Sequence, residues 1–354
     1  MILLLLFSKF LVNLYLNSSI ILNYIFYIEG GFMKNILKII TAGIFLFGIS
    51  LFTTSISAKD FTIYYVVHGG ITHPAWLANK AGVDDAAAML DDAKVVYVGP
   101  EIYKLEEFVN YVQTAVDANP DAIVTTMTAP DAMVPVLQPF ADKGGVIVEI
   151  NTGQACPDSL NCLTYVGYDP YESGVNAANK AFEMAKARGI TLKETLYPNH
   201  APGAVHVEEW GRGFMEQSEK LGMKTGQVDV TASEYTGADI ILAYKKKNPD
   251  VDFIYNISIP QVTTVMTRFA EEGITGVYQG TFDFTAEMVK EIAKDESVWF
   301  TQDQQMYIQG FQGTMAAYLN LKHQFILPPA ITTIGFTTPE NAMDMLASVE
   351  AGVR

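Results

Sequence analysis

Ten side chains that could contact a small molecule stand just after predicted strands or early in the following helix. They are histidines, uncharged amides, two carboxylates and two tryptophans. Amides donate and accept hydrogen bonds without charge, carboxylates accept them, and flat rings cover apolar C–H faces. This combination suits a neutral ligand with many hydroxyls. The ten candidates are His68, His73, Trp76, Asp131, Asn151, Asn199, Trp210, Asn256, Asp283 and Gln304.

Each candidate taken alone also has a structural explanation. Asp131 fits the cap of a helix, and Trp210 fits a hydrophobic core. The same holds for Asp303 in "TQDQQMYIQG", residues 301–310, which gathers three glutamines where a strand becomes a helix. The functional interpretation depends on the candidates recurring at strand ends in both halves of the chain.

The elements that would position these residues alternate regularly from Phe61 onward. Short apolar, β-branched runs predict strands, and each is followed by a helical pattern. The strands are expected at 61–67, 93–99, 121–126, 145–150, 163–168, 193–199, 223–230, 251–257, 276–282, 297–302 and 330–336, with helices between them and a terminal helix from about Pro339. This alternation predicts two doubly wound α/β domains with parallel sheets, whose ligands bind beyond the carboxyl ends of the strands.

The first 58 residues are expected to be a leader. From Met33 a short basic part precedes an apolar run at 39–52 and small residues that end at Ala58, the order of a secretory signal cleaved near Ala58–Lys59. Residues 1–32 would then be an upstream extension. The alternative is one or two membrane anchors, but the run at 39–52 is shorter than the ~20 residues of a spanning helix. No cysteine lies near the cleavage site, which disfavours a lipid anchor.

The net charge of the chain limits the partners that it can bind. The chain has a formal net charge of −16, with 23 basic and 39 acidic residues, and only three of the former and one of the latter precede Lys59. An acidic surface repels phosphate backbones, so nucleic acid is not an expected partner.

Cys156 and Cys162 are the only cysteines. In an oxidising compartment they are expected to form a disulfide, since a metal site needs more ligands than their loop offers.

Several longer segments resemble the periplasmic sugar-binding proteins of ABC transporters, of the ribose-binding-protein type (type I periplasmic binding proteins). The resemblance covers essentially Phe61 to the C-terminus. It is carried, in order, by "HPAWLANKAGVDDAA" (73–87), "VIVEINTG" (146–153), "YVGYDPYESG" (165–174), "GTFDFTAEMVKEIAKDESVWFTQDQQMYIQGFQG" (280–313) and "ILPPAITTIGFTTPENA" (326–342).

The resemblance implies two α/β lobes that close around a ligand by a hinge motion. Residues 59–168 and 304–330 would form the N-terminal lobe, and residues 169–303 and 331–354 the C-terminal lobe. Chain crossings are expected near 168–170, 303–306 and 329–332. The implied protein is an exported periplasmic monomer that delivers a small neutral sugar or polyol to an inner-membrane ABC permease, with no enzyme activity, cofactor or metal.

The resemblance also implies roles for single residues. His73 and Trp76 fall in the contact loop of the first lobe, and Asn151 falls at a polar ligand contact. Asp283 matches the ligand-binding aspartate of the family, and Gln304 matches a glutamine beside a hinge crossing. At the position of Trp210 the family usually has an arginine that grips sugar hydroxyls. The exchange removes hydrogen-bond donors and adds a stacking face, which leaves the ligand's identity open.

Other functions remain as alternatives. An exported carbohydrate enzyme would need an acid and a base, for which Asp131, His200 and Asp283 could serve, but the chain has neither a G-x-S-x-G motif nor a Walker-type loop. A metal site would use "HGGITH" (68–73) with His200 or His206, which is weak spacing evidence. A binding protein for a non-sugar ligand such as a nucleoside is also possible. A sugar-responsive repressor is disfavoured because no helix-turn-helix segment precedes Phe61.

Overall fold

The computed structural model describes residues 61–230, 234–332 and 335–354 of the chain. The expected leader and signal cleavage site lie outside these residues, as do the first two residues of the expected N-terminal lobe. Within the described ranges, no helix is both long and apolar enough to cross a membrane.

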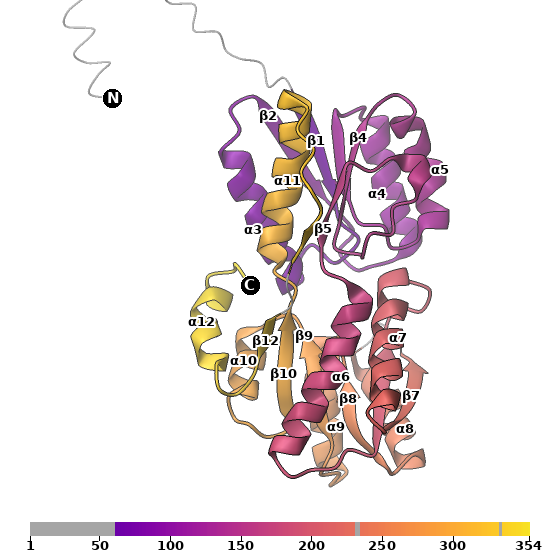
Figure 1. Cartoon of the computed structure of the whole chain (residues 1–354), viewed down its shortest axis with the longest axis vertical. Coiled ribbons are helices and arrows are strands. Elements are labelled where there is room, and N and C mark those ends of the chain that lie inside the picture. The colour runs from indigo at the N-terminus through magenta and orange to yellow at the C-terminus, as the bar shows by residue number, and fades with distance from the viewer. Residues whose placement is uncertain (1–60, 231–233, 333–334) are drawn as a thin grey trace, which may run out of the picture. The chain divides into compact units, whose positions relative to one another are not determined.

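The first lobe is built on a sheet of six parallel strands in the order β11-β5-β4-β3-β1-β2 (Figure 1). Helices α3 and α11 cover one face of this sheet, and α4 and α5 cover the other. The strands are β1 (Phe61–Val66), β2 (Ala93–Val98), β3 (Ala122–Thr125), β4 (Val146–Ile150), β5 (Thr164–Gly167) and β11 (Ala330–Ile331), and the helices are α3 (Pro74–Ala88), α4 (Leu105–Asp117), α5 (Pro130–Ala141) and α11 (Met306–His323).

The second lobe repeats this plan with the strand order β12-β10-β9-β8-β6-β7. Helices α6 and α7 pack together on one face, and α8, α9, α10 and α12 contribute to the other. The strands are β6 (Glu194–Asn199), β7 (Lys224–Asp229), β8 (Val251–Tyr255), β9 (Tyr278–Phe282), β10 (Val298–Asp303) and β12 (Gly335–Thr337), and the helices are α6 (Pro170–Ala187), α7 (Val205–Lys220), α8 (Glu234–Lys247), α9 (Ile259–Glu271), α10 (Ala286–Ile292) and α12 (Ala342–Glu350).

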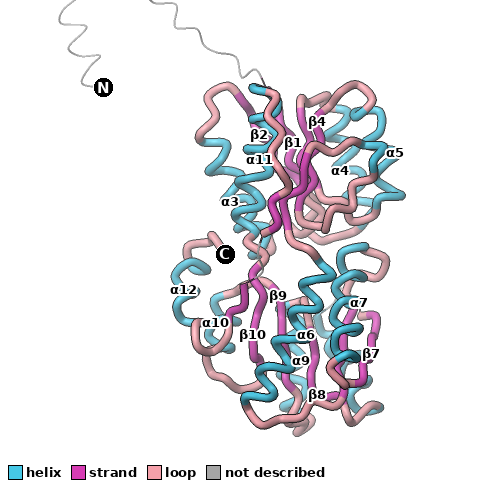
Figure 2. Tube along the Cα trace, viewed as in Figure 1, coloured by secondary structure: helices cyan, strands magenta, loops and turns pink. Residues whose placement is uncertain are grey.

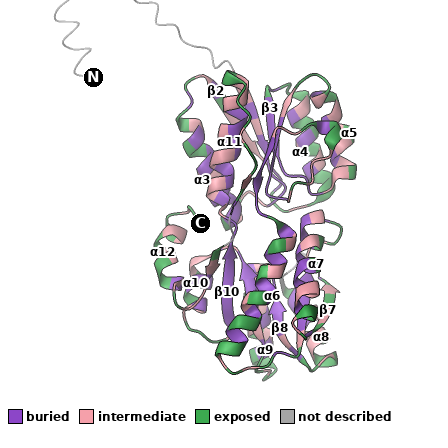
Figure 3. Ribbon diagram, in the orientation of Figure 1, coloured by how far each residue is buried: buried purple, intermediate pink, exposed green. Residues whose placement is uncertain are grey.

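The inner strands are buried between helices that cover both faces of each sheet (Figure 3). The edge strand β7 is polar and has no buried residue. In β1, Ile63 and Tyr65 enter the core under α3 and α11, whereas Val66 enters the core under α4 and α5. In β6, Leu196 and Tyr197 likewise enter opposite cores. The predicted doubly wound α/β architecture with two sheets is therefore confirmed.

The prediction was wrong in one region, the strand expected at 330–336. Its two ends belong to different sheets: β11 pairs in parallel with β5, whereas β12 pairs antiparallel with β10. The second sheet therefore carries one antiparallel edge strand. The apolar run from Ala330 to Phe336 looks continuous in sequence because both ends are strand-forming. A short 3-10 helix at Asp158–Leu160 was also not expected.

The chain passes from one lobe to the other between β5 and α6, between β10 and α11, and after β11 (Figure 2). These places overlap the three expected crossings. The exact lobe boundaries stay a prediction, and Ile331 pairs with Gly167 in the first sheet.

Glycines allow one close helix pair in each lobe. A Cβ at Gly82 of α3 would lie 2.0 Å from the carbonyl oxygen of Tyr307 in α11, and one at Gly310 would lie 2.1 Å from that of Asn79. In the second lobe, a Cβ at Gly174 of α6 would lie 2.2 Å from the carbonyl oxygen of Trp210 in α7. Any side chain at these positions would push the helices apart. The glycines therefore set the distance between the paired helices, which include α7 with Trp210 and α11 with most of the 304–310 segment.

Candidate ligand-binding site

A chain of hydrogen bonds between side chains joins the two lobes at the carboxyl ends of their strands. Asn151, directly after β4, donates from Nδ2 to Oε1 of Gln304 at 2.7 Å. Gln304, directly after β10, donates from Nε2 to Oδ1 of Asp283 at 2.6 Å. Asp283 directly follows β9. Three predicted candidates are thus brought together, with Gln304 as the central residue.

The backbone holds the two ends of this chain in an unusual conformation. Asn151 and Asp283 have φ angles of 70° and 67°, in the left-handed region that non-glycine residues seldom adopt. Asparagine and aspartate tolerate this region best. Burial raises the pKa of the Asp283 carboxyl to about 7, and its hydrogen bond from Gln304 acts in the opposite direction. The carboxyl therefore changes charge near neutral pH.

The glutamines of 301–310 supply the amides of this network. Gln309 accepts from Asn151 through Oε1 at 2.9 Å and donates from Nε2 to the carbonyl oxygen of Gln304 at 2.8 Å. Asp303 instead accepts from the backbone of Gln305 at 2.7 Å and forms an ion pair with Arg354. Asp303 therefore has a structural role.

Trp210 lies in an aromatic cluster beside Asp283. Its indole stacks on Tyr168 with ring centres 5.1 Å apart and planes at 8°, and it meets the Phe282 ring edge-on at 4.5 Å. Only 6% of Trp210 is exposed. Its flat faces pack against protein, but Nε1 is buried without a hydrogen-bond partner in the described part of the chain. Trp210 thus occupies a core position and also has an unpartnered donor. The sequence alone could not distinguish a core role from a ligand-binding role.

Trp76 and His68 form the matching aromatic surface of the first lobe. The two rings meet edge-on at 5.0 Å, and His68 Nδ1 lies 2.9 Å from Oγ1 of Thr126. The indole of Trp76 lies so close to Gly69 that a Cβ there would come within 1.7 Å of Nε1. His73 caps α3 by accepting from the backbone of Ala75 at 3.3 Å.

Histidines from both lobes meet at this site, a feature that the spacing of the candidates did not reveal. The rings of His68 and His206, from different lobes, have centres 5.2 Å apart. Burial, reinforced by His200, lowers the pKa of His68 to about 3. Burial and the charge of His73 lower the pKa of His200 to about 4. Burial and then His68 and His200 lower the pKa of His206 well below its usual range.

Several buried polar atoms around this cluster have no hydrogen-bond partner among the residues that the structure describes. Natively buried polar groups are nearly always paired, so each such atom needs an explanation. Some of these atoms lie elsewhere, for example Nε1 of Trp299 in β10. Five others belong to the candidates or to residues that interact with them. These atoms are the Tyr168 hydroxyl, Nδ1 of His200, Nδ1 of His206, Nε1 of Trp210 and Nδ2 of Asn256.

The remaining candidates make local contacts or none. Asn199 donates to Glu208 at 3.0 Å and accepts from the backbone of Ala201 at 3.0 Å, which braces the loop before α7. Asn256 accepts from the backbone of Ser258 at 3.3 Å. Asp131 is exposed in the first turn of α5, and the cap of that helix is Ala129 instead. The structure therefore gives Asp131 less support than the other candidates.

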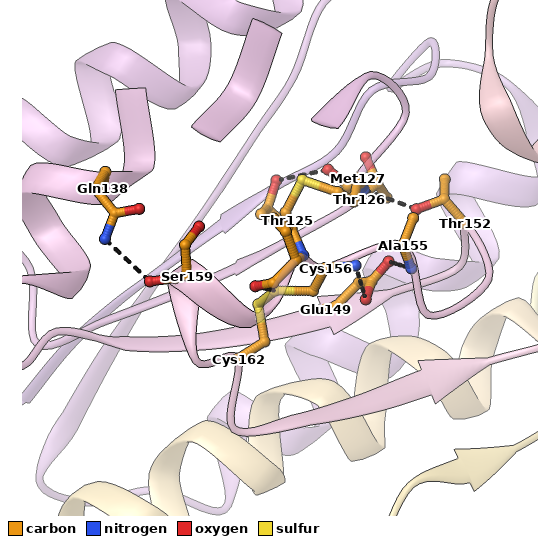
Figure 4. The surroundings of a disulfide bond; sticks show 11 residues. Thr125, Thr126, Met127, Gln138, Glu149, Thr152, Ala155, Cys156, Ser159 and Cys162 are labelled. Carbon is orange, nitrogen blue, oxygen red and sulfur yellow. Dashed lines mark hydrogen bonds between the residues drawn. A yellow bond between two sulfur atoms is a disulfide. The ribbon is translucent and has the colours of Figure 1, made fainter. Parts of the chain in front are cut away.

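The disulfide expected between Cys156 and Cys162 is present and closes the loop that follows Asn151 (Figure 4). Both oxygens of Glu149 accept backbone N–H groups of this loop, from Ala155 at 2.7 Å and Cys156 at 3.0 Å. Burial raises the pKa of the Glu149 carboxyl to about 7, although these two hydrogen bonds lower it. The disulfide and Glu149 together fix the loop next to Asn151.

Two cavities lie beside this cluster rather than within it. A cavity of about 550 Å³ opens next to the first crossing, and one of about 300 Å³ lies by the disulfide loop. Tyr168 and Thr152 line the larger one. The rings of His68 and His206 contact each other across the two lobes. Among the described residues, no group of three or more histidines, cysteines or carboxylates has a geometry that could hold a metal.

Comparison with known proteins identifies the family. The family model described as "Periplasmic binding protein domain" matches residues 63–324, most of the chain. The chain belongs to the periplasmic binding protein domain family. The sequence-based assignment to periplasmic binding proteins is therefore confirmed. This family consists of proteins that bind transported substrates.

Individual members of the periplasmic binding protein family agree with this assignment. The xylose/arabinose-binding protein of Sulfolobus acidocaldarius is 24% identical over 293 residues, which cover 78% of this chain and 70% of that protein. A carbohydrate transporter protein of Acidothermus cellulolyticus 11B, solved with myo-inositol, has a TM-score of 0.73 and 22% identity over 83% of this chain and 99% of that one. A solute-binding protein of Agrobacterium vitis, solved with α-D-tagatopyranose, has a TM-score of 0.72 and 21% identity over the same shares. These two structures support the fold.

Proposed function

We propose that this protein binds a small neutral sugar or sugar-like polyol between its two lobes and delivers it to an ABC importer. The observation that carries the proposal is the Asn151–Gln304–Asp283 chain of hydrogen bonds. It places a carboxylate acceptor, Asp283, where the lobes meet, and the same lobe carries donors on Trp210 and Asn256 that have no hydrogen-bond partner among the described residues. Hydroxyl groups can both donate to Asp283 and accept from these donors, whereas a hydrocarbon would leave all of them unpaired.

The aromatic rings fit the other side of such a ligand. Sugars and cyclic polyols have apolar C–H faces that pack on flat rings, and Trp76 supplies such a ring in the first lobe, whereas Trp210 contributes its indole donor. The sugars and the inositol named for the related proteins belong to this chemical class.

The proposed mechanism is closure of the lobes about the chain crossings. A ligand that contacts both lobes stabilises the closed form by its differential affinity for that form, and a permease then recognises the closed shape. Gln304 lies immediately after the crossing strand β10 and contacts residues of both lobes, so it can couple ligand contact to closure. Export through the leader and a monomeric state are parts of this proposal.

The proposal includes no enzyme activity. Burial lowers the pKa of His200 to about 4, so this ring is not a base poised near neutral pH, and Asp131 is exposed in the first turn of α5. Asp283 is engaged by an amide, which is typical of a binding contact.

A thermal-shift screen tests the proposal. The purified protein, refolded to remove any co-purified ligand, is heated with pentoses, hexoses, inositols and nucleosides. A ligand at ~1,000 times its dissociation constant stabilises the folded state by about 4 kcal/mol, a rise of several degrees in the melting temperature. We expect a sugar or polyol to produce this shift. A shift with a nucleoside alone, or with no compound, would contradict the proposed ligand class.

A further inference from the structure

Four of the five histidines of the chain act on one another electrostatically where the lobes meet. His68 and His73 belong to the first lobe, and His200 and His206 belong to the second. His68 and His206 are in ring-to-ring contact across the boundary at 5.2 Å. A backbone hydrogen bond of 3.1 Å from the nitrogen of Val205 to the oxygen of Thr128 joins the lobes beside this contact. The structure therefore shows the lobes in contact at the histidines.

The environment of these rings favours their neutral form. His68 is surrounded edge-on by the rings of Trp76, Tyr103 and Phe108. His206 contacts Trp210 at 5.7 Å. The charges that act on His68, His200 and His206 are those of other histidines. A proton placed on one ring therefore meets an apolar surrounding and, once a second ring is protonated, a like charge.

The acidic groups nearby do not compensate such a charge. Glu208 accepts hydrogen bonds from Asn199 and from the backbone of Gly203. Asp131 and Glu101 are exposed on the first lobe. Tyr103 stays neutral because burial raises its pKa. Asp283 bonds to Gln304 instead of to a histidine.

We propose that His68, His73, His200 and His206 form a proton-operated release switch, in which the lobes stay closed only while these rings are neutral. This switch rests on the proposed function, because opening of the lobes releases a cargo only if the protein binds one between them. In the open form the rings reach solvent and can take up protons at their ordinary pKa near 6.5. Acid therefore favours the open form.

The sign and size of the effect follow from proton linkage. A histidine whose pKa is lowered in the closed form has no effect above about pH 6.5. Below that pH, each such ring weakens closure by up to about tenfold per pH unit. Asp283 acts in the opposite direction, because its raised pKa makes the closed form take up one proton as pH falls through 7. Several rings outweigh one carboxyl, so we expect a net loss of closure of at least tenfold between pH 7.5 and pH 5.0.

Small-angle X-ray scattering of the ligand-free protein tests the switch without a known ligand. The radius of gyration of the wild type should be larger at pH 5.0 than at pH 7.5 and should return when the pH is restored. The His68→Asn/His206→Gln double variant should respond less. His323→Gln is the matched control, because His323 is an exposed residue of α11 away from the cluster. Circular dichroism at each pH shows whether each protein is folded, and the radii are compared only over the pH range in which it is.

The outcomes separate this inference from the proposed function. A wild-type radius that is constant over the folded pH range would overturn the switch, and so would equal pH responses in the wild type and the double variant. A sugar that binds at pH 7.5 and equally well at pH 5.0 would also overturn it, while leaving the proposed function intact. Conversely, if no sugar binds at any pH but the radius responds as expected, the proposed ligand is wrong and the switch stands.

Discussion

Asp283 and Asn151 follow strands of different sheets, yet a single side chain, that of Gln304, contacts both. Its amide donates to the Asp283 carboxylate at 2.6 Å and accepts from Asn151 at 2.7 Å. An amide is suited to this position because it donates with one atom and accepts with the other. A ligand that contacts Asp283 therefore acts on a residue whose hydrogen bond to Gln304 belongs to a chain that spans both lobes.

Replacement of Asp283 should affect binding strongly. At pH 8.5, above the raised pKa of about 7 of the Asp283 carboxyl, this group is ionised. Ligand hydroxyls then lose a charged acceptor in Asp283→Asn, an interaction typically worth about 1.5–3 kcal/mol, so the dissociation constant should rise by about 10- to 150-fold. Isothermal titration calorimetry with the sugar found by screening measures this. Asp344→Asn, at an exposed position in the first turn of α12, is the control and should bind like the wild type. Unchanged affinity in Asp283→Asn would remove Asp283 from the site.

The Asn151–Gln304 hydrogen bond should be measurable as a coupling energy. In a double-mutant cycle with Asn151→Ala and Gln304→Ala, urea unfolding should give a coupling of about 1 kcal/mol or more, since both side chains are buried. The matched pair is Gln113 and Asp117, whose exposed hydrogen bond of 2.8 Å lies on α4. That pair should couple by less than about 0.5 kcal/mol. Additive effects at 151 and 304 would contradict the bridging role.

Trp210 and Trp299 form a natural pair for testing the role of the free indole donor. Both are buried, both stack on a tyrosine, and both have an unpartnered Nε1. Replacement by phenylalanine should lower stability at both positions by about 1–2 kcal/mol. Only Trp210→Phe should also weaken sugar binding, by about fivefold, because only its donor lies in the proposed site. Equal affinities of the two variants would show that Trp210 is a core residue alone.

The disulfide should contribute to stability more than to closure. Cys156→Ser/Cys162→Ser should lower the free energy of unfolding by about 2 kcal/mol, as expected for a short closed loop. Dithiothreitol should have the same effect on the wild type and none on the double variant, which chemical denaturation can measure. A variant as stable as the wild type would mean that Glu149 alone, through its two backbone hydrogen bonds, orders the loop.

Most of the secondary structure could be predicted from the sequence because each strand and helix carries its own periodic pattern. The exception, 330–336, failed because a chain crossing between two sheets leaves no local signal when both ends are strand-forming. Gly82 and Gly174, which allow the close helix pairs, likewise look ordinary in sequence.

The candidate site was only partly accessible to sequence reasoning. Asn151, Asp283 and Gln304 could be found because each directly follows a strand, and the topology brings strand ends together. The contact between His68 and His206 could not, because it depends on side chains in different lobes that are 138 positions apart in the chain. The sequence did contain one indication of this contact: four of its five histidines lie at strand ends or early in helices.

A crystal structure of the protein with the sugar found by thermal shift tests the central claim most directly. Our account predicts ligand oxygens within hydrogen-bonding distance, about 3 Å, of the Asp283 carboxylate and of Nε1 of Trp210, with both lobes in contact with the ligand. A sugar bound instead in the cavity lined by Thr152, Tyr165 and Tyr168, with the Asp283–Gln304 hydrogen bond unchanged and no contact to Trp210, would contradict it.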